Sequence, residues 1–106
     1  MRFEALELSL SCIAILRKLL PSIRTRDSRL ATHIRDAGSS VSLNLGEGNR
    51  RTGRDRLHLW NIAAGSAEEV RVALRVAVAW GYLEEKAVAE ALQHIDRLNP
   101  DYSWTP

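Results

Sequence analysis

The sequence predicts an all-α protein built as an antiparallel, up-down bundle of four helices. Four segments carry apolar residues at spacings of three and four, which is the period of an α-helix. The breaks between them are short, and six glycines and three prolines leave little material for the turns of a β-sandwich. A length of 106 residues, with 45% hydrophobic and 26% charged residues, is typical of one globular domain, here residues 1–106.

The first predicted helix covers residues 3–20. Its apolar stripe consists of Leu6, Leu10, Ile13, Leu16 and Leu20. Pro21 is expected to end this helix, because the residue before a proline is pushed out of helical geometry.

The second predicted helix covers residues 29–45, with Asp27 or Ser28 as its N-cap. Residues 38–42 are unusually small, and glycine and serine are weak helix formers. We therefore expect a neighbouring backbone to approach this helix closely.

The third predicted helix is long and covers residues 53–80. The hydroxyl of Thr52 is expected to accept a hydrogen bond from the backbone N–H of Asp55, and Gly81 suits the left-handed position after the helix. Residues 70–78 also alternate like a strand, but the helical period runs into them without a turn signal, so we predict helix.

The fourth predicted helix covers residues 84–98 and is closed by Asn99 and Pro100. The tail beyond it carries Tyr102 and Trp104. We expect these two rings to pack on the bundle; stacking on nucleic-acid bases and docking in a groove between subunits are the alternatives.

Apolar residues wrap further around two of these helices than a lone bundle needs. On the third helix they cover about 220°, whereas a surface helix needs a little over ~100°. The first helix carries a second apolar stripe beside its first. This surplus predicts a closed homo-oligomer, with a thick core in one chain as the alternative. The predicted interface residues are Leu8, Ile15, Leu19, Val72 and Val76.

Several classes of protein are excluded by the same sequence. Charged residues near the N-terminus exclude a signal peptide, and no apolar run approaches the ~18 residues of a membrane span. The single cysteine, Cys12, cannot form an internal disulfide and fits a reducing compartment. We therefore expect a cytoplasmic protein without a membrane partner, with Cys12 in its core.

The sequence contains few residues in the spacing that a catalytic site needs. His33, His58 and His94 lie on three different predicted helices, and no zinc-binding or Glu-x-x-His pair is present. A nucleophilic role for Ser40 lacks a positioned base. The sequence thus predicts no enzyme, no catalytic residues, no metal and no cofactor.

Positive charge is concentrated in the first half of the chain. Residues 1–56 hold 11 Lys and Arg against 6 Asp and Glu, whereas residues 57–106 hold 4 against 7. Four arginines cluster where the third helix begins, and a helix N-terminus favours phosphate. A second group precedes the second helix, and up-down topology places it at the opposite end of a simple bundle. The predicted nucleic-acid-binding residues are Arg50, Arg51, Arg54, Arg56, Arg24, Arg26 and Arg29.

The alternative for the first group is a solvated loop whose arginines pair with neighbouring acids. Gly46 and Gly48 allow a close backbone approach, but the segment is neither a Walker loop nor a dinucleotide fingerprint.

Residues 32–48, followed by Arg50, Arg51 and a long helix ending at residues 80–83, resemble a four-helix-bundle family encoded in intervening sequences of bacterial 23S ribosomal RNA genes. Relatives include the accessory variability protein of diversity-generating retroelements. The matching residues are Ile34, Arg35, Ala37, Ser40, Val41, Asn44, Glu47 and Gly48.

The resemblance implies a homopentamer, shaped as a short barrel with a basic surface and without catalytic residues. For the retroelement relatives it implies binding to nucleic acid and to a reverse transcriptase. Five copies of this chain would carry only +10 in total, since one copy carries +2. On physical grounds we read Asn44 and Glu47 as closing the second helix.

We therefore predict a non-enzymatic homopentamer that binds RNA or DNA, a reverse-transcriptase-type partner, or both, through its arginines. The alternative is a protein–protein adaptor without nucleic-acid affinity.

Overall fold

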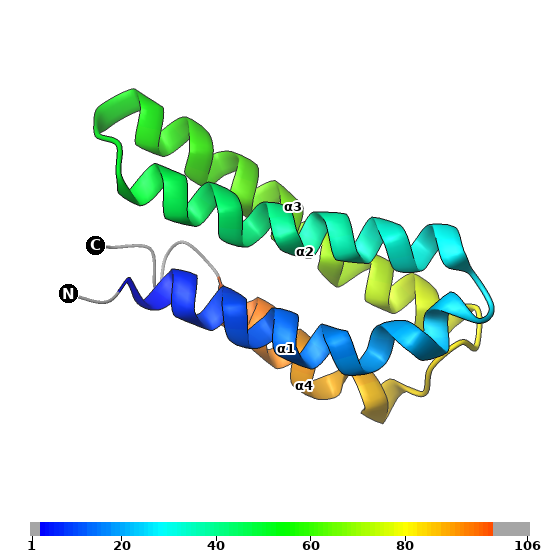
Figure 1. The fold of residues 1–106 in the computed structure, drawn as a ribbon. Coiled ribbons are helices and arrows are strands. Elements are labelled where there is room, and N and C mark those ends of the chain that lie inside the picture. Colours follow the sequence, from blue (N-terminus) through cyan, green and yellow to red (C-terminus); the bar gives the residue numbers. More distant parts are fainter. Residues whose placement is uncertain (1–2, 99–106) are drawn as a thin grey trace.

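The structure, a computed structural model, describes residues 3–98 and consists of four α-helices in up-down order (Figure 1). They are α1 (Glu4–Arg24), α2 (Ser28–Asn49), α3 (Gly53–Ala79) and α4 (Glu85–Arg97). The molecule is a rod of 42 × 22 × 18 Å. No strand occurs in residues 3–98, so the predicted all-α class and four-helix bundle are confirmed, including helix where residues 70–78 alternate.

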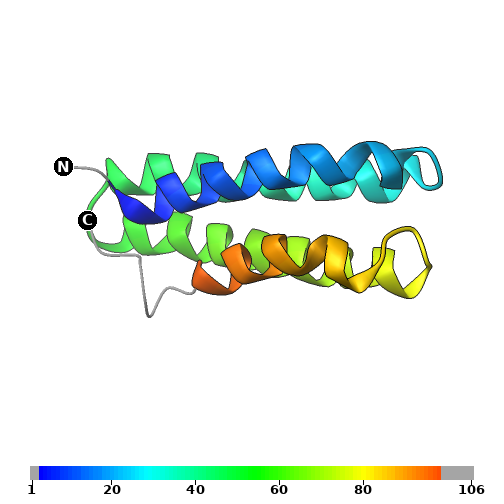
Figure 2. The same cartoon turned by 90° about the horizontal axis from the view of Figure 1, so that it is seen from below.

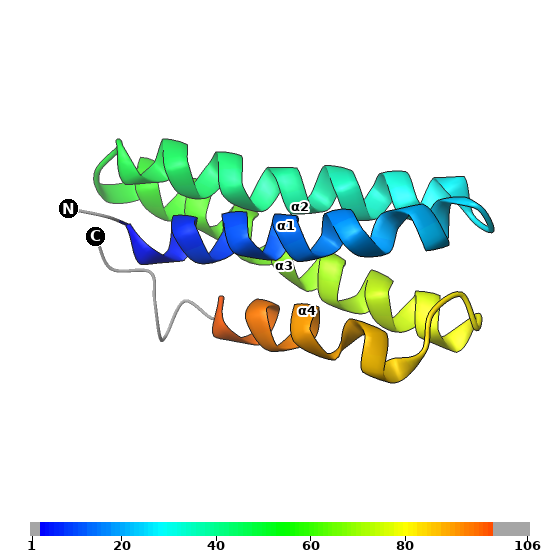
Figure 3. The ribbon, with the colours of Figure 1, turned by 60° about the horizontal axis from the view of Figure 1, so that its bottom comes forward.

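The four helices form a ring in which α2 and α4 lie diagonally opposite. Helix α2 packs against α1 and α3, and α4 packs against the same two helices from the other side. Figure 3 shows α4 on the side of the molecule away from α2. The turn between α2 and α3 lies at one end of the rod, and the other two turns lie together at the opposite end, which we call the paired-turn end (Figure 2).

Helix α1 does not stop at Pro21, contrary to the prediction. Pro21 lies inside the helix, one turn before its end at Arg24, and its carbonyl accepts the backbone N–H of Thr25 at 3.2 Å. Ile23 is fully buried in the core. Burial of that side chain outweighs the local penalty of a proline, which here loses one solvent-side hydrogen bond.

Helix α2 begins as expected but runs four residues further than predicted. The side chain of Asp27 accepts the backbone N–H of Leu30 at 3.0 Å, which confirms the N-cap. The helix continues to Asn49 because Leu45 and Gly48 are buried. Asn44 does not close the helix as predicted: it lies inside it and donates to the carbonyl of Ser40 at 2.8 Å.

The ends of α3 and α4 fall within one residue of the predicted ends. The predicted cap by the Thr52 hydroxyl is wrong, since Thr52 makes no side-chain capping bond. Instead Gly53, with φ of 58°, opens α3 in a left-handed conformation that glycine adopts readily. Gly81, with φ of 80°, confirms the expected residue after α3.

The small residues of α2 let both neighbouring helices approach, as predicted. A Cβ added at Gly38 would lie 3.3 Å from the Cδ1 atom of Leu16 on α1. The hydroxyls of Ser9 and Ser42 lie 2.8 Å apart between α1 and α2. On the other side, Ser66 of α3 donates to the hydroxyl of Ser40 at 2.8 Å. These paired hydroxyls satisfy one another at helix contacts.

The core runs along the whole rod in two clusters. The larger one gathers residues from all four helices, and the smaller one lies toward the N-terminus of α1. Cys12 is 5% exposed within the larger cluster, and burial raises the pKa of its thiol to about 11. Its placement in the core is confirmed.

The predicted interface residues are only partly covered in one chain. Val72 on α3 is 46% exposed, and Val76 is half-buried. Leu8, Ile15 and Leu19 on α1 are half-buried and pack against the edges of the two core clusters. The apolar surplus is therefore present on α3 and smaller than expected on α1, while the number of copies stays a prediction.

Two further predictions concern membrane spans and the residues after position 98. No helix in the described part of the chain is both long and apolar enough to span a bilayer. The predictions for Asn99, Pro100, Tyr102 and Trp104 lie outside the described residues.

Candidate nucleic-acid interface

The turn between α2 and α3 is built around Trp60, which packs directly on the backbone of α2. A Cβ added at Gly48 would lie 2.6 Å from the Cδ1 atom of Trp60 and 2.7 Å from its Nε1 atom. The indole also stacks on Phe3 with ring centroids 5.4 Å apart. Gly48 is therefore required for the contact between α2 and α3, and it is buried under the indole.

Arg56 belongs to this packed structure and not to the exposed surface. Its Nε donates to the carbonyl of Gly48 at 3.2 Å, and its Nη2 donates to the carbonyl of Asn49 at 3.1 Å. Its guanidinium carbon lies 5.3 Å from the ring centroid of Trp60. Arg56 thus closes the C-terminal end of α2, where carbonyls lack helical partners and favour a cation.

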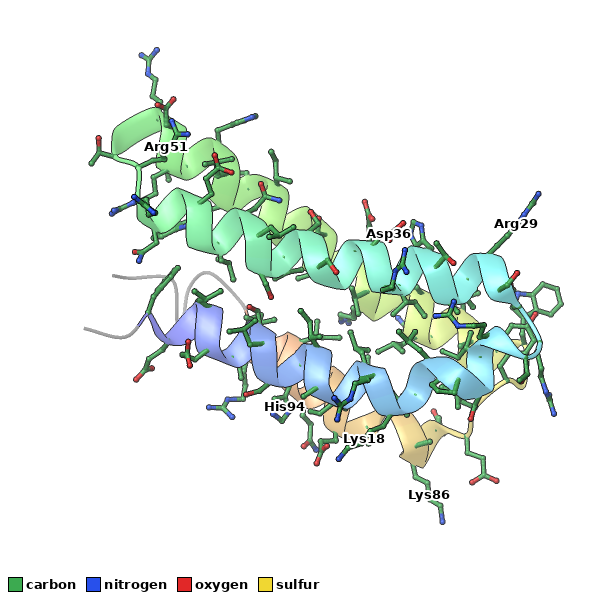
Figure 4. All side chains as sticks on the ribbon, in the orientation of Figure 1. Lys18, Arg29, Asp36, Arg51, Lys86 and His94 are labelled. Atoms are coloured by element: carbon green, nitrogen blue, oxygen red, sulfur yellow. The ribbon has the colours of Figure 1, made fainter. Side chains whose placement is uncertain are left out.

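The other three arginines of this group project from the turn. Arg50, Arg51 and Arg54 are exposed, and Figure 4 shows Arg51 at the turn at the end of α2. Arg51 pairs with Glu47 at 3.1 Å, an exposed pair that contributes little to stability. Beside them α3 begins without a side-chain cap, so its first N–H groups can meet an anion, and Asp55 in the first turn is the acidic residue at this end.

The second arginine group lies at the paired-turn end. Arg24 ends α1, Arg26 lies in the following turn and Arg29 lies in the first turn of α2; all three are exposed. Figure 4 shows Arg29 and Arg51 at opposite ends of α2. As the up-down topology indicated, one copy does not bring the two groups together.

The residues considered for catalysis make the following contacts. The hydroxyl of Ser40 accepts hydrogen bonds from Ser66 and from Asn44. His33 is exposed and lies 3.7 Å from Glu69 across α2 and α3. His94 on α4 lies 3.0 Å from the carbonyl of Glu90. Within residues 3–98, no three His, Cys, Asp or Glu side chains are grouped to hold a metal ion.

Two features of these ends were missed from the sequence. The contact of Gly48 with Trp60 joins residues twelve apart across a turn, and the signal for it is a glycine inside a helix opposite an aromatic residue. The second is Trp80, which ends the longest helix yet is 69% exposed. No role was predicted for it from the sequence.

The fold and these surfaces define a small helical-bundle protein with arginines exposed at both ends of the rod. The chain belongs to the 23S rRNA-intervening sequence protein family, whose model matches residues 3–101. The family resemblance drawn from residues 32–48 is therefore confirmed.

A solved structure has the same fold. It is described as a protein with unknown function from the S23 ribosomal protein family of Bacteroides thetaiotaomicron VPI-5482. The two chains superpose with a TM-score of 0.81 and 18% sequence identity, over 90% of this chain and 91% of that chain. At this identity the likeness shows the fold alone. No curated protein matches the chain.

Proposed function

We propose that this chain is a non-enzymatic, self-associating bundle protein that binds RNA through the arginines at the α2–α3 turn. The observation that carries the proposal is the exposure of Arg50, Arg51 and Arg54 beside the uncapped start of α3. One guanidinium group can bind two phosphate oxygens at once, and the helix dipole adds to the attraction between the turn and the phosphate. The family description refers to an intervening sequence of 23S rRNA, and we take RNA as the anionic partner.

A charge-reversal variant tests the proposal. In the triple variant Arg50→Glu, Arg51→Glu and Arg54→Glu, binding of a short labelled, fully paired RNA duplex should be lost, with the helical circular dichroism unchanged. For the wild type, log affinity should fall linearly with log salt, by ~0.9 for each phosphate contact. Binding that survives the triple change would reject the proposal.

The chain offers a matched control. Arg17, Lys18 and Arg75 are exposed and lie along the middle and far part of the rod, away from the α2–α3 turn. Reversing these three charges changes the net charge by the same amount. This control variant should keep most of the affinity and the full salt dependence, because it leaves the proposed contacts intact.

The second candidate is an assembly or adaptor module without nucleic-acid affinity. It is favoured by large apolar side chains that one copy leaves in solvent. They are Leu10, Leu43, Leu57, Ile62, Val72 and Trp80. A homopentamer is our proposal for the assembly, and native mass spectrometry measures the number of copies. No RNA binding at low salt, together with a stable assembly or a captured reverse transcriptase, would favour the adaptor.

A further inference from the structure

The paired-turn end holds its two turns together by two hydrogen bonds. Arg26 donates from Nη1 to the carbonyl of Gly81 at 3.1 Å. The hydroxyl of Tyr82 donates to the Oδ2 atom of Asp27 at 3.1 Å. The turn after α1 and the turn after α3 are therefore fixed relative to each other. Trp80 immediately precedes the tied Gly81, so its backbone is held in place while its ring stays in solvent.

The ring of Trp80 lies on the α2 side of α3. Eleven residues separate Trp80 from Glu69, and eleven residues turn a helix by ~1100°, which returns to within ~20° of the same direction. Glu69 lies 3.7 Å from His33 of α2, which shows that this side of α3 borders α2. The 69% exposed indole therefore points to the α2 side at the end of α3.

Two arginines also lie on helix faces that border the α2 side. Arg29 precedes His33 by one helical turn and so lies on the same border of α2. Arg24 follows Leu6 by eighteen residues, which is five full turns of α1. The side chain of Leu6 lies 3.8 Å from a Cβ added at Gly46 of α2, so this side of α1 also borders α2.

The acidic side chains on the α2 side have partners of their own. Glu69 lies 3.7 Å from His33. Asp27 already accepts the N–H of Leu30 with one oxygen and the hydroxyl of Tyr82 with the other. Glu84 and Glu85 begin α4, which packs against α1 and α3 on the side away from α2. Figure 4 shows Arg29 and Lys86 pointing to opposite sides of the rod at this end.

The start of α2 also offers hydroxyl and imidazole groups. An open depression of about 370 Å³ next to Arg29 is lined by Ser28, Arg29, Thr32, His33 and Asp36. Asp36 pairs with Arg35 at 3.2 Å. Hydroxyl donors beside a guanidinium suit a sugar-phosphate backbone, whose oxygens accept hydrogen bonds.

We propose that the paired-turn end binds single-stranded RNA by stacking an unpaired base on Trp80 while Arg24 and Arg29 contact the adjacent phosphates. The inference rests on the proposed function, since both take RNA as the ligand, but it uses the opposite end of the rod. Aromatic side chains between basic groups bind unpaired bases because every base has a planar face. A base inside a duplex is already stacked and does not reach the ring.

The test compares a short oligouridine with a fully paired RNA duplex. Trp80→Ala should weaken oligouridine binding by roughly 5- to 100-fold, the effect of losing one stacked base. Duplex binding should change by less than about twofold, because it depends on phosphate contacts alone. Trp80→Phe should keep most of the affinity, since phenylalanine retains a stacking face. Leu43→Ala, which removes another side chain that is 70% exposed, is the matched control and should change neither.

Salt dependence tests the arginines separately. Replacing Arg24 and Arg29 by Ala should lower the salt slope for oligouridine by about 1.4, which corresponds to two single-strand phosphate contacts. Neither residue takes part in the two hydrogen bonds between the turns, so the fold is preserved.

Each outcome separates the two proposals. If the wild type binds neither RNA, both are wrong. If the triple change at Arg50, Arg51 and Arg54 removes duplex binding while Trp80→Ala leaves oligouridine binding unchanged, the proposed function holds and this inference is rejected. The same holds if Trp80→Ala changes the number of copies in native mass spectrometry without a selective loss of oligouridine, since the ring is then a contact between copies.

Discussion

The two ends of the rod carry the same kinds of residue in opposite roles. At the α2–α3 turn, Trp60 packs on Gly48 and lies beneath the guanidinium of Arg56. At the paired-turn end, Trp80 is 69% exposed and Arg26 reaches the next carbonyl, that of Gly81. Trp60 therefore takes part in a structural contact with Arg56 at one end, whereas Trp80 is an exposed ring at the other.

The difference comes from what faces each ring. Trp60 meets a residue without a side chain on α2, so its indole can lie against the helix backbone. Trp80 follows the last turn of α3, directly before the left-handed Gly81, and its side chain is left 69% exposed. The comparison teaches that the partner on the neighbouring helix decides the role of an aromatic residue in this bundle.

The largest expected effect comes from exchanging each tryptophan for alanine. Trp60→Ala should lower the free energy of unfolding by ~2–4 kcal/mol, because it removes the stack on Phe3 and leaves a gap at Gly48. Trp80→Ala should change it by less than about 0.5 kcal/mol. Urea unfolding at low protein concentration measures both. Equal losses for the two variants would contradict the assignment of roles.

Replacing either of two helical glycines by alanine gives the next largest effects on stability, and the two effects have opposite signs. Gly48→Ala should destabilise the fold by ~1–2 kcal/mol, since its Cβ would overlap the indole of Trp60 and this outweighs the gain in helix propensity. Gly65→Ala meets nothing within 4 Å and should stabilise α3 by ~0.5–1 kcal/mol. The double variant Gly48→Ala with Trp60→Ala is the control: without the indole, the glycine change should become neutral or favourable.

Arg56 and Arg26 both donate to backbone carbonyls, and replacing them by alanine should lower the free energy of unfolding by different, smaller amounts. Arg56→Ala should lower stability by ~1–2 kcal/mol, because two partly buried carbonyls lose their donor and the indole loses its cation. Arg26→Ala loses one exposed hydrogen bond and should cost less than about 0.5 kcal/mol. Thermal unfolding followed by circular dichroism measures both, and a larger loss at Arg26 would reverse the comparison.

The smallest effect concerns Tyr82 and alkaline pH. Partial burial raises the pKa of Tyr82, and the carboxylate of Asp27 that accepts its hydrogen bond raises it further, while Arg26 lowers it. The unfolded chain then loses this proton at a lower pH than the folded chain, so stability falls as pH rises through the tyrosine range near ~10. Tyr82→Phe should reduce this loss slightly. If stability depends on alkaline pH in the same way in Tyr82→Phe and in the wild type, the hydrogen bond to Asp27 does not contribute to this pH dependence.

The helices were predictable because their apolar residues recur with a helical period over long segments. Two of their ends were not. Pro21 and the glycines near residue 48 are local stop signals, but burial of Ile23 and of Gly48 against neighbouring helices overrides them.

The candidate site was predictable in part, for a related reason. Composition identified the arginines at both ends, and the topology placed them apart. The sequence does not reveal that Arg56 turns back onto the carbonyls of Gly48 and Asn49, because that contact depends on how the chain reverses at Gly53.

The four helices form two hairpins, α1 with α2 and α3 with α4, and the chain joins them covalently only at the turn after α2. At the far end two hydrogen bonds, from Arg26 to Gly81 and from Tyr82 to Asp27, are the bonds that link the turns. Separating the hairpins at that end would require both hydrogen bonds to break, whereas the covalent turn after α2 holds the other end together. Amide hydrogen exchange should accordingly be faster in the turns after α1 and α3 than at the end of α2 beneath Arg56.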